Sequence, residues 1–558
     1  MEFNNFKNWV QAHNGLIFQK DSFERIEEAF NFFEEYGTIE LDARIFNRLH
    51  PKSKQTKFGI TYTPKNIRQE IIYTIFKKLK KQERKIIDLT FCDPCSGSGT
   101  FAIDVALELT KYGIDLYFIF NNNIYISDKD EVSLLLSMSN IYLFLKRNDI
   151  NVFDIRLNAS LVDFFIDNKK YDVFITNPPY VKLQNITITE REYLKTKFKE
   201  VFSGALGTAP LFLFHMLNRL NQNGLVGVIT QNNFFTSIAA KKIRYHISKH
   251  LYQINTFGSN HIFEDVSAYT CLLFLSKEEQ LTFNYVKDSI FCEMKNDVLD
   301  PEKWRLGTPS QLFFLRKTES SGIRLGDLCD IFVGVATLKD KAFTVFNENG
   351  QWVSQSPSGQ KLIIESGVIK PLIKISELNS DVDIENNSRG IIFPYEIEEN
   401  KFRPFTEEKF QDIYPQTYLA LRLWKNELKL RSSFKKGSVW YEWGRTQSMK
   451  SIKDKLLTKT FNNFPQFMLD TTDSLFSNGY ALKPKGVSLS FIQKILNSQF
   501  FWKYAKLTSF EIEGGYQCYQ KNFIENFTIP ESLIALEEEV INMKYLSSTF
   551  FDKHYELL

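Results

Sequence analysis

The sequence has few cysteines and no long apolar run, and both absences exclude classes of protein. Six cysteines in 558 residues are too few for a disulfide scaffold. The one Cys-x-x-Cys pair, Cys92 and Cys95, has no second pair or matching histidine set, so no metal site is expected. No stretch of about 18 uncharged apolar residues is present, so no transmembrane helix and no membrane partner are expected. The N-terminus lacks the basic start and apolar core of a signal peptide, which predicts a cytoplasmic protein.

The sequence also has no large excess of positive or negative charge, because its formal net charge is only +3. This balance neither demands nor excludes nucleic acid as a partner, since a local basic patch matters more than the total. The length predicts two or more domains, each with its own core. Residues 1–50 have apolar positions at helical spacing, which predicts a helical N-terminal arm without chemistry of its own.

The segment 171–180 carries the most chemistry. Its apolar residues 173–175 predict a short buried strand, which must end at Asn177 because Pro178 and Pro179 lack backbone donors. The Asn177 side chain and the Pro178 carbonyl are two acceptors, which suit an amino group with two hydrogens, and Tyr180 offers a flat face for stacking. This pattern favours a pocket for an aromatic amine at the carboxyl end of a strand. The alternative is a strand followed by a Pro-Pro turn with a partly exposed tyrosine.

A second segment has the order strand, glycine-rich loop and helix. Residues 86–91 predict the strand, residues 92–101 the loop and residues 102–109 the helix. Glycines let the backbone approach a ligand, and the helix N-terminus supplies free N–H groups. The loop is not the dinucleotide-binding Gly-x-Gly-x-x-Gly, and it lacks the lysine of a phosphate-binding loop. It therefore favours a nucleoside that carries an amino acid over a polyphosphate.

Two further elements are predicted on either side of this loop. Residues 124–128 predict a strand that ends at Asp128, with a helix over 132–145 after it. An acid at this strand tip would accept hydrogen bonds from the two hydroxyls of a ribose, and the alternative is an ordinary turn aspartate. Upstream, Thr63 is predicted to cap a helix over 66–79 whose first turn contains Pro64.

These segments together resemble the gamma-class, TaqI-like adenine-N6 DNA methyltransferases of restriction–modification systems. The shared order is Tyr62-Thr63-Pro64, then Asp93 to Phe101, then Asn177 to Tyr180, and the resemblance covers roughly residues 55 to 535. It implies an α/β fold with a doubly wound, mostly parallel, Rossmann-like methyltransferase sheet and a second, mixed α+β target-recognition domain. The implied domains are a helical arm (1–50), the methyltransferase domain (51–305), the target-recognition domain (306–535) and a C-terminal helix or tail (536–558).

The resemblance implies S-adenosyl-L-methionine as the methyl donor. By position, Asp93 and Gly97 would lie at the methionine end of the cofactor, Asp128 at its ribose and Thr63 near its carboxylate. The implied cofactor-binding residues are Thr63, Asp93, Pro94, Ser96, Gly97, Gly99 and Asp128. The chain departs from the family at Ala159, where an aspartate often holds the adenine amine, and at 209–212, where Asp-Leu-Tyr is common. Asn158 or Asp163 could replace the missing acid.

The resemblance also implies the chemistry and the second substrate. Asn177, Pro178, Pro179 and Tyr180 would hold a flipped-out adenine, and acceptors on both N6 hydrogens would free the nitrogen lone pair for methyl transfer. Tyr269 or Phe274 could cover the other face of the base, with core packing as the alternative. The C-terminal half has many basic residues between 422 and 459, which predicts phosphate contacts. Arg445, Gln447 and Gln520 are candidates for base contacts.

The main hypothesis is therefore a sequence-specific DNA adenine-N6 methyltransferase that acts on duplex DNA. It would be the modification enzyme of a type II restriction–modification system with a separately encoded endonuclease. One alternative is a methylase subunit that needs a specificity partner, and another is a protein-glutamine methyltransferase. The contrasting alternative is a non-catalytic DNA-binding subunit of a defence complex. A fused restriction enzyme is not expected, because neither end has room for a nuclease.

Overall fold

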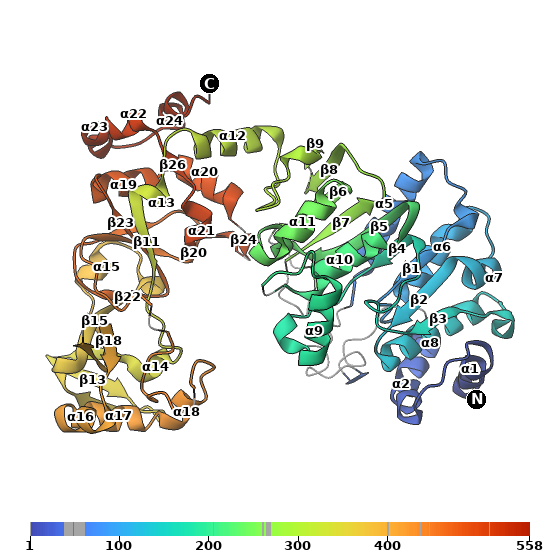
Figure 1. Cartoon of the computed structure of the whole chain (residues 1–558), viewed down its shortest axis with the longest axis horizontal. Helices are drawn as coiled ribbons and strands as arrows, with labels where there is room; N and C mark the ends of the chain where they lie inside the picture. The colour runs from blue at the N-terminus through green and yellow to red at the C-terminus, as the bar shows by residue number, and fades with distance from the viewer. Residues whose placement is uncertain are drawn as a thin grey trace. The chain divides into compact units, whose positions relative to one another are not determined.

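The computed structural model divides into two compact units, Met1–Thr308 and Pro309–Leu558 (Figure 1). It describes residues 2–37, 48–49, 62–204, 206–258, 262–263, 269–288, 290–398, 401–435, 437–445, 447–509, 511–512 and 514–557. The start of the segment that leads into Tyr62, residues 59–61, and the basic residue Lys436 lie outside these ranges. Among the helices in the described part of the chain, none is long and apolar enough to cross a membrane.

The first unit is built on one large sheet. Its described strands lie in the order β3-β2-β1-β4-β5-β7-β6-β8-β9, and only β7 and β9 run against the others (Figure 1). This is a doubly wound, mostly parallel sheet, as predicted. The strands are β1 Phe91–Asp93, β2 Ile124–Asp128, β3 Asn158–Leu161, β4 Tyr171–Thr176, β5 Leu220–Gln231, β6 Leu251–Thr256, β7 Thr270–Ser276, β8 Thr282–Lys287 and β9 Ile290–Lys295.

Helices cover both faces of this sheet. Helix α6 contacts both α5 and α8, and α10 packs with α11. Close approach of α5 requires Gly227 in β5, because a Cβ there would lie 2.9 Å from atoms of Ile71 and Ile75. The bounds are α5 Lys65–Lys81, α6 Thr100–Thr110, α8 Glu131–Arg147, α9 Ile188–Lys197, α10 Thr208–Asn218 and α11 Lys241–Ser248.

The predictions for the elements around the glycine-rich loop are confirmed except at two points. Helices α6 and α8 and strands β2 and β4 lie where the sequence places them. The predicted strand 86–91 is wrong, because Ile86–Asp88 form a 3₁₀ turn and β1 begins only at Phe91. The predicted cap is also wrong: Pro64 is the N-cap of α5, and the cap makes no side-chain hydrogen bond. The Thr63 hydroxyl has a different partner, described below.

The N-terminal helices α1 (Glu2–His13) and α2 (Lys20–Tyr36) belong to the same hydrophobic core as the sheet. Helix α2 packs on α8, and the Trp9 indole of α1 donates to the Ile155 carbonyl at 3.1 Å. Tyr142 of α8 contacts the rings of both Phe6 and Trp9. The predicted helical character of this segment is thus confirmed for its described residues.

The second unit combines smaller sheets with short helices. Its two largest described sheets have the orders β11-β23-β19-β21 and β14-β13-β12-β16-β15-β22. Lys455 and Asp470 form a fully buried ion pair across β19 and β21. The strands are β11 Cys329–Val333, β12 Thr344–Glu348, β13 Gln351–Gln355, β14 Lys361–Ile364, β15 Ile369–Lys374, β16 Arg389–Ile392, β19 Lys455–Lys459, β21 Phe467–Asp470, β22 Leu475–Ser477 and β23 Gly479–Pro484; the longer helices are α12 Pro309–Ser320, α17 Pro415–Arg422, α19 Leu489–Leu496 and α20 Gln499–Thr508.

Candidate functional site

The carboxyl ends of β1, β2, β3 and β4 meet at one edge of the sheet and surround a cavity, here called the first cavity. Parallel strands place their carboxyl ends together, so segments far apart in sequence come into contact there. The lining residues come from the glycine-rich loop, the β2–α8 turn, the segment after β3 and the segment after β4. They are Pro94, Cys95, Gly97, Asp128, Lys129, Asp130, Ser133, Asp163, Phe164, Phe165, Asn177, Pro179, Val181, Ile186, Thr208 and Phe212.

Backbone hydrogen bonds fix the glycine-rich loop against β2. The Ser96 amide donates to the Ser127 carbonyl at 3.0 Å, and the Gly97 amide donates to Asp128 Oδ2 at 3.2 Å. Gly99 is the N-cap of α6 with φ +75°, and a Cβ there would lie 2.7 Å from Ser137 Oγ. Glycine is therefore required at this position both for its dihedral angle and for its lack of a side chain.

Two carboxyl groups at this edge have raised pKa values because they are removed from water. Burial raises the pKa of Asp128 to about 6, against the lowering effect of hydrogen bonds from the Asp130 and Gly97 amides. Burial likewise raises the pKa of Asp93 to about 7, although Thr176 Oγ1 donates to its Oδ1 at 2.7 Å. Asp128 lines the first cavity, whereas Asp93 lies behind it between β1 and β4.

The two residues predicted as replacements for an acid at Ala159 lie in different environments. Asp163 lines the first cavity, and its Oδ1 accepts from the Phe165 amide at 2.9 Å. Asn158, the other alternative, donates to the backbone carbonyls of Asn121 and Ile124 at 3.0 and 3.3 Å, within the sheet region. The structure therefore places a carboxylate in the cavity four residues beyond the position of the family's aspartate.

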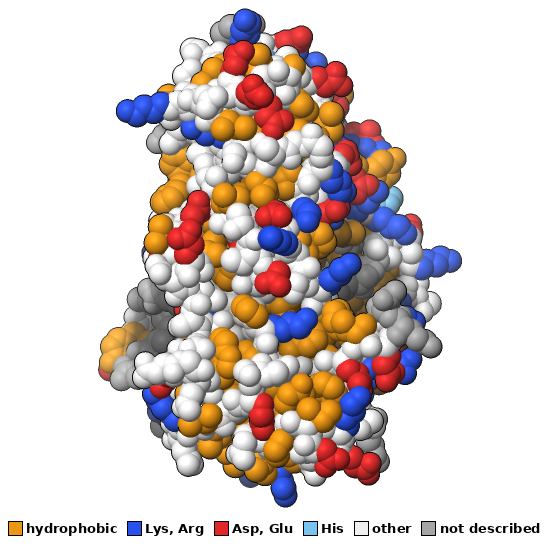
Figure 2. Space-filling view, turned by 90° about the vertical axis from the view of Figure 1, so that its left-hand side faces the viewer, with side chains coloured by type: hydrophobic (Ala, Val, Ile, Leu, Met, Phe, Trp, Pro, Cys, Tyr) orange, Lys and Arg blue, Asp and Glu red, His pale blue; other side chains and the backbone are white. Residues whose placement is uncertain are grey.

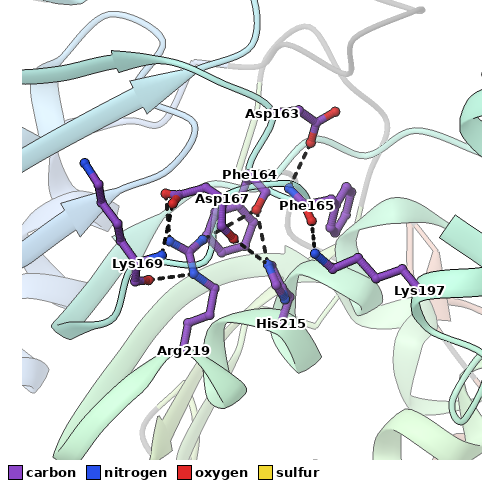
Figure 3. A network of polar contacts seen from close by, with 8 residues as sticks. All are labelled: Asp163, Phe164, Phe165, Asp167, Lys169, Lys197, His215 and Arg219. Carbon is purple, nitrogen blue, oxygen red and sulfur yellow. Dashed lines mark hydrogen bonds and ion pairs between the residues drawn. The ribbon is translucent and has the colours of Figure 1, made fainter. Parts of the chain in front are cut away.

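A buried polar network holds this segment from below (Figure 3). Arg219 donates to the Lys169 carbonyl at 2.7 Å and pairs with Asp167 Oδ2 at 2.7 Å. Its guanidinium carbon also lies 4.5 Å from the centre of the Phe164 ring. Arg219 is 4% exposed, so water cannot solvate its charge, and the Asp167 carboxylate balances that charge instead.

His215 and α9 complete the network in Figure 3. His215 Nε2 lies 3.2 Å from the Phe164 carbonyl, which can only accept, so this nitrogen carries the proton. Burial lowers the pKa of His215 to about 4, which keeps the ring neutral at ordinary pH. From α9, the Tyr193 hydroxyl (3.2 Å) and the Lys197 ammonium both donate to the Phe165 carbonyl. The walls of the cavity at Phe164 and Phe165 are thus fixed through their backbones.

A direct hydrogen bond joins the Tyr-Thr-Pro segment to the Asn-Pro-Pro-Tyr segment. Asn177 Nδ2 donates to Thr63 Oγ1 at 3.1 Å. The Thr63 carbonyl accepts from Arg68 Nη1 at 2.6 Å, and Arg68 in turn pairs with Asp104 Oδ2 at 2.6 Å. Arg68 is 3% exposed, so this ion pair is a fixed, buried anchor. It connects α5, α6 and the end of β4.

The segment that follows β4 separates the first cavity from a second cavity. Thr208, at the start of α10, donates through Oγ1 to the Pro179 carbonyl at 2.6 Å and accepts from the Val181 amide at 3.1 Å. Val181 and Thr208 line both cavities. The remaining residues of the second cavity are Tyr180, Lys182, Leu183, Gln184, Arg191, Lys195, Phe202, Gly204, Leu206, Gly207, Ala209, Pro210, Gln231, Asn233, Phe234, Ser237 and Ala240.

The aromatic residues predicted to contact a base lie in different environments. Tyr180 lines the second cavity and donates through its hydroxyl to the Ile229 carbonyl at 3.2 Å. Tyr269 lies at the same sheet edge, where its carbonyl accepts from the Asn232 amide. Phe274 is fully buried in the middle of β7 and packs against Tyr252, so the suggested stacking role is wrong and the core alternative holds. Phe234, which the sequence reasoning missed, lines the second cavity.

The predicted cofactor-binding residues do not all line the first cavity. Of the predicted cofactor-binding residues, Pro94, Gly97 and Asp128 line the first cavity, while Thr63, Asp93, Ser96 and Gly99 lie behind it. Cys92 and Cys95 are free thiols. Within the ranges that the structure describes, no group of three or more histidine, cysteine or carboxylate side chains could hold a metal.

In the second unit, exposed Arg445 pairs with Ala336 in an isolated β-bridge, whereas half-buried Gln520 follows β25 (Tyr516–Cys518). Among the described contacts, no hydrogen bond joins Arg445, Gln447 or Gln520 to one another. Arg431 is not available to phosphate, because it donates to the carbonyls of Thr337, Trp440 and Glu442. On the face shown in Figure 2, basic side chains are interspersed with acidic and apolar ones.

Most of the first unit is similar to a known protein family. Residues 46–303 match the family model described as N-6 DNA Methylase. This region is therefore similar to the N-6 DNA methylase family. The matched region contains both cavities, the hydrogen bond from Asn177 to Thr63 and the hydrogen bond from Thr208 to the Pro179 carbonyl.

Two curated relatives extend this comparison. The chain is 25% identical over 380 residues to the type II restriction enzyme and methyltransferase RM.Eco57I of Escherichia coli, a match over 59% of this chain and 37% of that protein. It is 32% identical over 206 residues to the type II methyltransferase M.VspI of Vibrio sp. (strain 343), over 36% of this chain and 43% of that protein. The chain thus spans less than half the length of each of these relatives.

A solved structure resembles both units of the chain. The type IIL restriction–modification enzyme MmeI, solved in complex with DNA, superposes with a TM-score of 0.64 at 14% identity, covering 93% of this chain and 78% of that chain. At this identity the likeness shows the fold alone.

Proposed function

We propose that this chain transfers a methyl group from S-adenosyl-L-methionine to N6 of an adenine in duplex DNA, at a specific sequence. The observation that carries this proposal is the position of the Asn-Pro-Pro-Tyr segment between two cavities. Asn177 and Pro179 line the first cavity, and Tyr180 lines the second. A donor bound on one side and an acceptor base on the other would meet at Asn177, as in-line transfer requires.

The first cavity has the chemistry that the cofactor needs. Asp128 would accept from the ribose hydroxyls, and the Asp163 carboxylate would accept from the adenine amine. Phe164, Phe165 and Phe212 supply apolar walls for the adenine ring. The bound cofactor would supply an electrophilic methyl group together with its own leaving group. The acidic lining, with Asp128, Asp130 and Asp163 against one lysine, suits its positive charge.

The chain's own residues would activate the acceptor. Asn177 Oδ1 and the Pro178 carbonyl would accept from the two N6 hydrogens and favour pyramidal nitrogen, which frees the lone pair. These two acceptors would hold the amino group in line with the methyl group, and N6 would lose one proton to solvent after the transfer. A paired base could not reach this site, so it would be flipped out and stacked on Tyr180.

The second unit is proposed to recognise the target sequence. Its exposed cations, Arg422, Lys429, Lys435, Arg445, Lys450 and Lys453, suit phosphate contacts. Arg445, Gln447 and Gln520 are proposed as base contacts. In a restriction–modification system the partner would be a separately encoded endonuclease of the same specificity.

The test is to incubate the purified chain with unmethylated genomic DNA and S-adenosyl-L-methionine and to map N6-methyladenine by single-molecule sequencing. Methylation confined to one short motif is expected. Cofactor binding without methylation would point to a methylase subunit that needs a specificity partner. Absence of both would favour a non-catalytic DNA-binding subunit, and DNA cleavage by the same preparation would add a nuclease to the assignment.

A further inference from the structure

The second cavity has a cationic wall that the methyl-transfer chemistry does not use. Its charged lining residues are Lys182, Arg191 and Lys195, and no carboxylate among the described residues lines it. The first cavity has the opposite character, because three aspartates line it. Two adjoining cavities of opposite charge, separated by one loop, are suited to ligands of opposite charge.

Of these three cations, only Lys195 forms an ion pair among the described residues. Lys195 pairs with Glu192 at 2.7 Å, one turn earlier on α9. In the described part of the chain, neither Lys182 nor Arg191 takes part in an ion pair. These two side chains therefore leave two positive charges on the wall without a carboxylate counter-charge.

The positions of Lys182 and Arg191 are fixed by backbone contacts. Lys182 forms an isolated β-bridge with Gly207, next to the Thr208 contacts that hold the loop. Arg191 donates through Nε to the Leu183 carbonyl at 3.0 Å, immediately after Lys182. The guanidinium Nη groups are separate donors from this Nε, so they stay available to a ligand. The backbone of Lys182 and the side chain of Arg191 are thus held in place beside the second cavity.

The sequence spacing relates this wall to the base-stacking residue. Lys182 follows Tyr180 by two residues, and both residues line the second cavity. A ligand with a flat ring at Tyr180 would place an attached anionic group near Lys182 and Arg191. A nucleotide has this form, with its base and its flanking phosphodiester on either side of the sugar.

We propose that Lys182 and Arg191 bind the phosphodiester that flanks the flipped-out nucleotide and hold the strand in its extruded conformation. This proposal rests on the proposed function for the identity of the base. It assigns the anion as a phosphate of the DNA strand. Bidentate guanidinium contacts suit phosphate geometry, and the lysine adds a point charge.

The test compares Lys182→Gln, Arg191→Gln and their double variant with the matched control Lys195→Gln. The probe is a fluorescent single-stranded deoxyoligonucleotide, whose bases need no extrusion, and its affinity is measured by anisotropy over about 50–200 mM salt. Each lost phosphate contact should lower the slope of log affinity against log salt by about 0.7. The double variant should therefore lose about 1.4, and Lys195→Gln should keep the wild-type slope.

A second measurement links the wall to turnover. In methylation of unmethylated genomic DNA, the double variant should raise the KM for DNA about tenfold or more, with cofactor affinity by calorimetry unchanged. Equal effects of all three single variants, or a wild-type slope in the double variant, would overturn the proposal. If wild-type protein transfers no methyl group but the slopes change as expected, the phosphate site stands and the proposed function fails.

Discussion

Asn177 Nδ2 donates to the hydroxyl of Thr63 at 3.1 Å, across 114 residues of sequence. The hydroxyl lies at the head of α5, whose position is fixed by the buried pair of Arg68 and Asp104. Because one end of the Asn177 amide is held in this way, the orientation of its other end is set before substrate binds. Thr63 is therefore a positioning residue for Asn177.

Replacing Thr63 with valine should lower kcat about tenfold, because the buried Asn177 amide loses an acceptor at a cost of about 1–2 kcal/mol. Thr63→Ser, which keeps the hydroxyl, should restore most of the rate. Initial rates with saturating DNA and cofactor measure this effect. A raised KM for the cofactor with normal kcat would instead place Thr63 at the cofactor carboxylate, as the family resemblance implies.

Asn177→Ala should reduce methyl transfer by at least about 10²–10³-fold, because an acceptor for the N6 hydrogens is lost at the reacting centre. Cofactor affinity should stay close to that of the wild type, because Asp128 and Asp163 are unchanged. Single-turnover rates and calorimetry separate the two effects. Wild-type turnover in this variant would show that the reacting atoms lie elsewhere.

Substitution of Asp163 and of Asn158 should affect cofactor binding differently, because only Asp163 lines the first cavity. Asp163→Ala should weaken cofactor binding about tenfold or more, because a charged acceptor for the adenine amine is removed. Asn158→Ala should leave cofactor affinity unchanged but lower the melting temperature, because the Asn121 and Ile124 carbonyls lose a donor. The opposite pattern, measured by calorimetry and thermal unfolding, would assign the adenine amine to Asn158.

Cofactor binding should depend on pH through Asp128. Its pKa is raised to about 6, so the carboxyl takes up a proton as the pH falls below that value and becomes a weaker acceptor for ribose hydroxyls. The dissociation constant should therefore be constant above about pH 7 and rise towards tenfold per pH unit well below 6. Asp128→Asn should bind weakly at every pH. A pH dependence that survives in this variant would point to Asp93, whose pKa is raised to about 7.

Local patterns in the sequence predict the elements that carry the site. The apolar run 173–175, the acid at Asp128 and the glycine-rich loop each mark the end of a strand, because proline, glycine and turn residues act on the backbone within a few positions. The stop of β4 and the starts of α6 and α8 follow from the same short-range effects. These elements and their order are confirmed in the structure.

The errors arise where a distant contact overrides a local preference. Thr63 precedes a helix and suits a cap, but its hydroxyl bonds Asn177 instead. Phe274 matches a family segment, but its place in the middle of β7 buries it completely. Arg431 lies in a basic stretch, yet three backbone carbonyls of the second unit surround its guanidinium. The partner of Thr63 lies 114 residues away in sequence, and one partner of Arg431, Thr337, lies 94 residues away.

The sequence by itself determined the strand ends, the loop glycines and the Asn-Pro-Pro-Tyr segment, because backbone chemistry acts locally. Only the tertiary structure decided that Asp163 and not Asn158 lines the first cavity, and that Lys182 and Arg191 line the second. Side-chain direction and ion pairing depend on which strands and helices become neighbours, and that is settled by packing the whole domain.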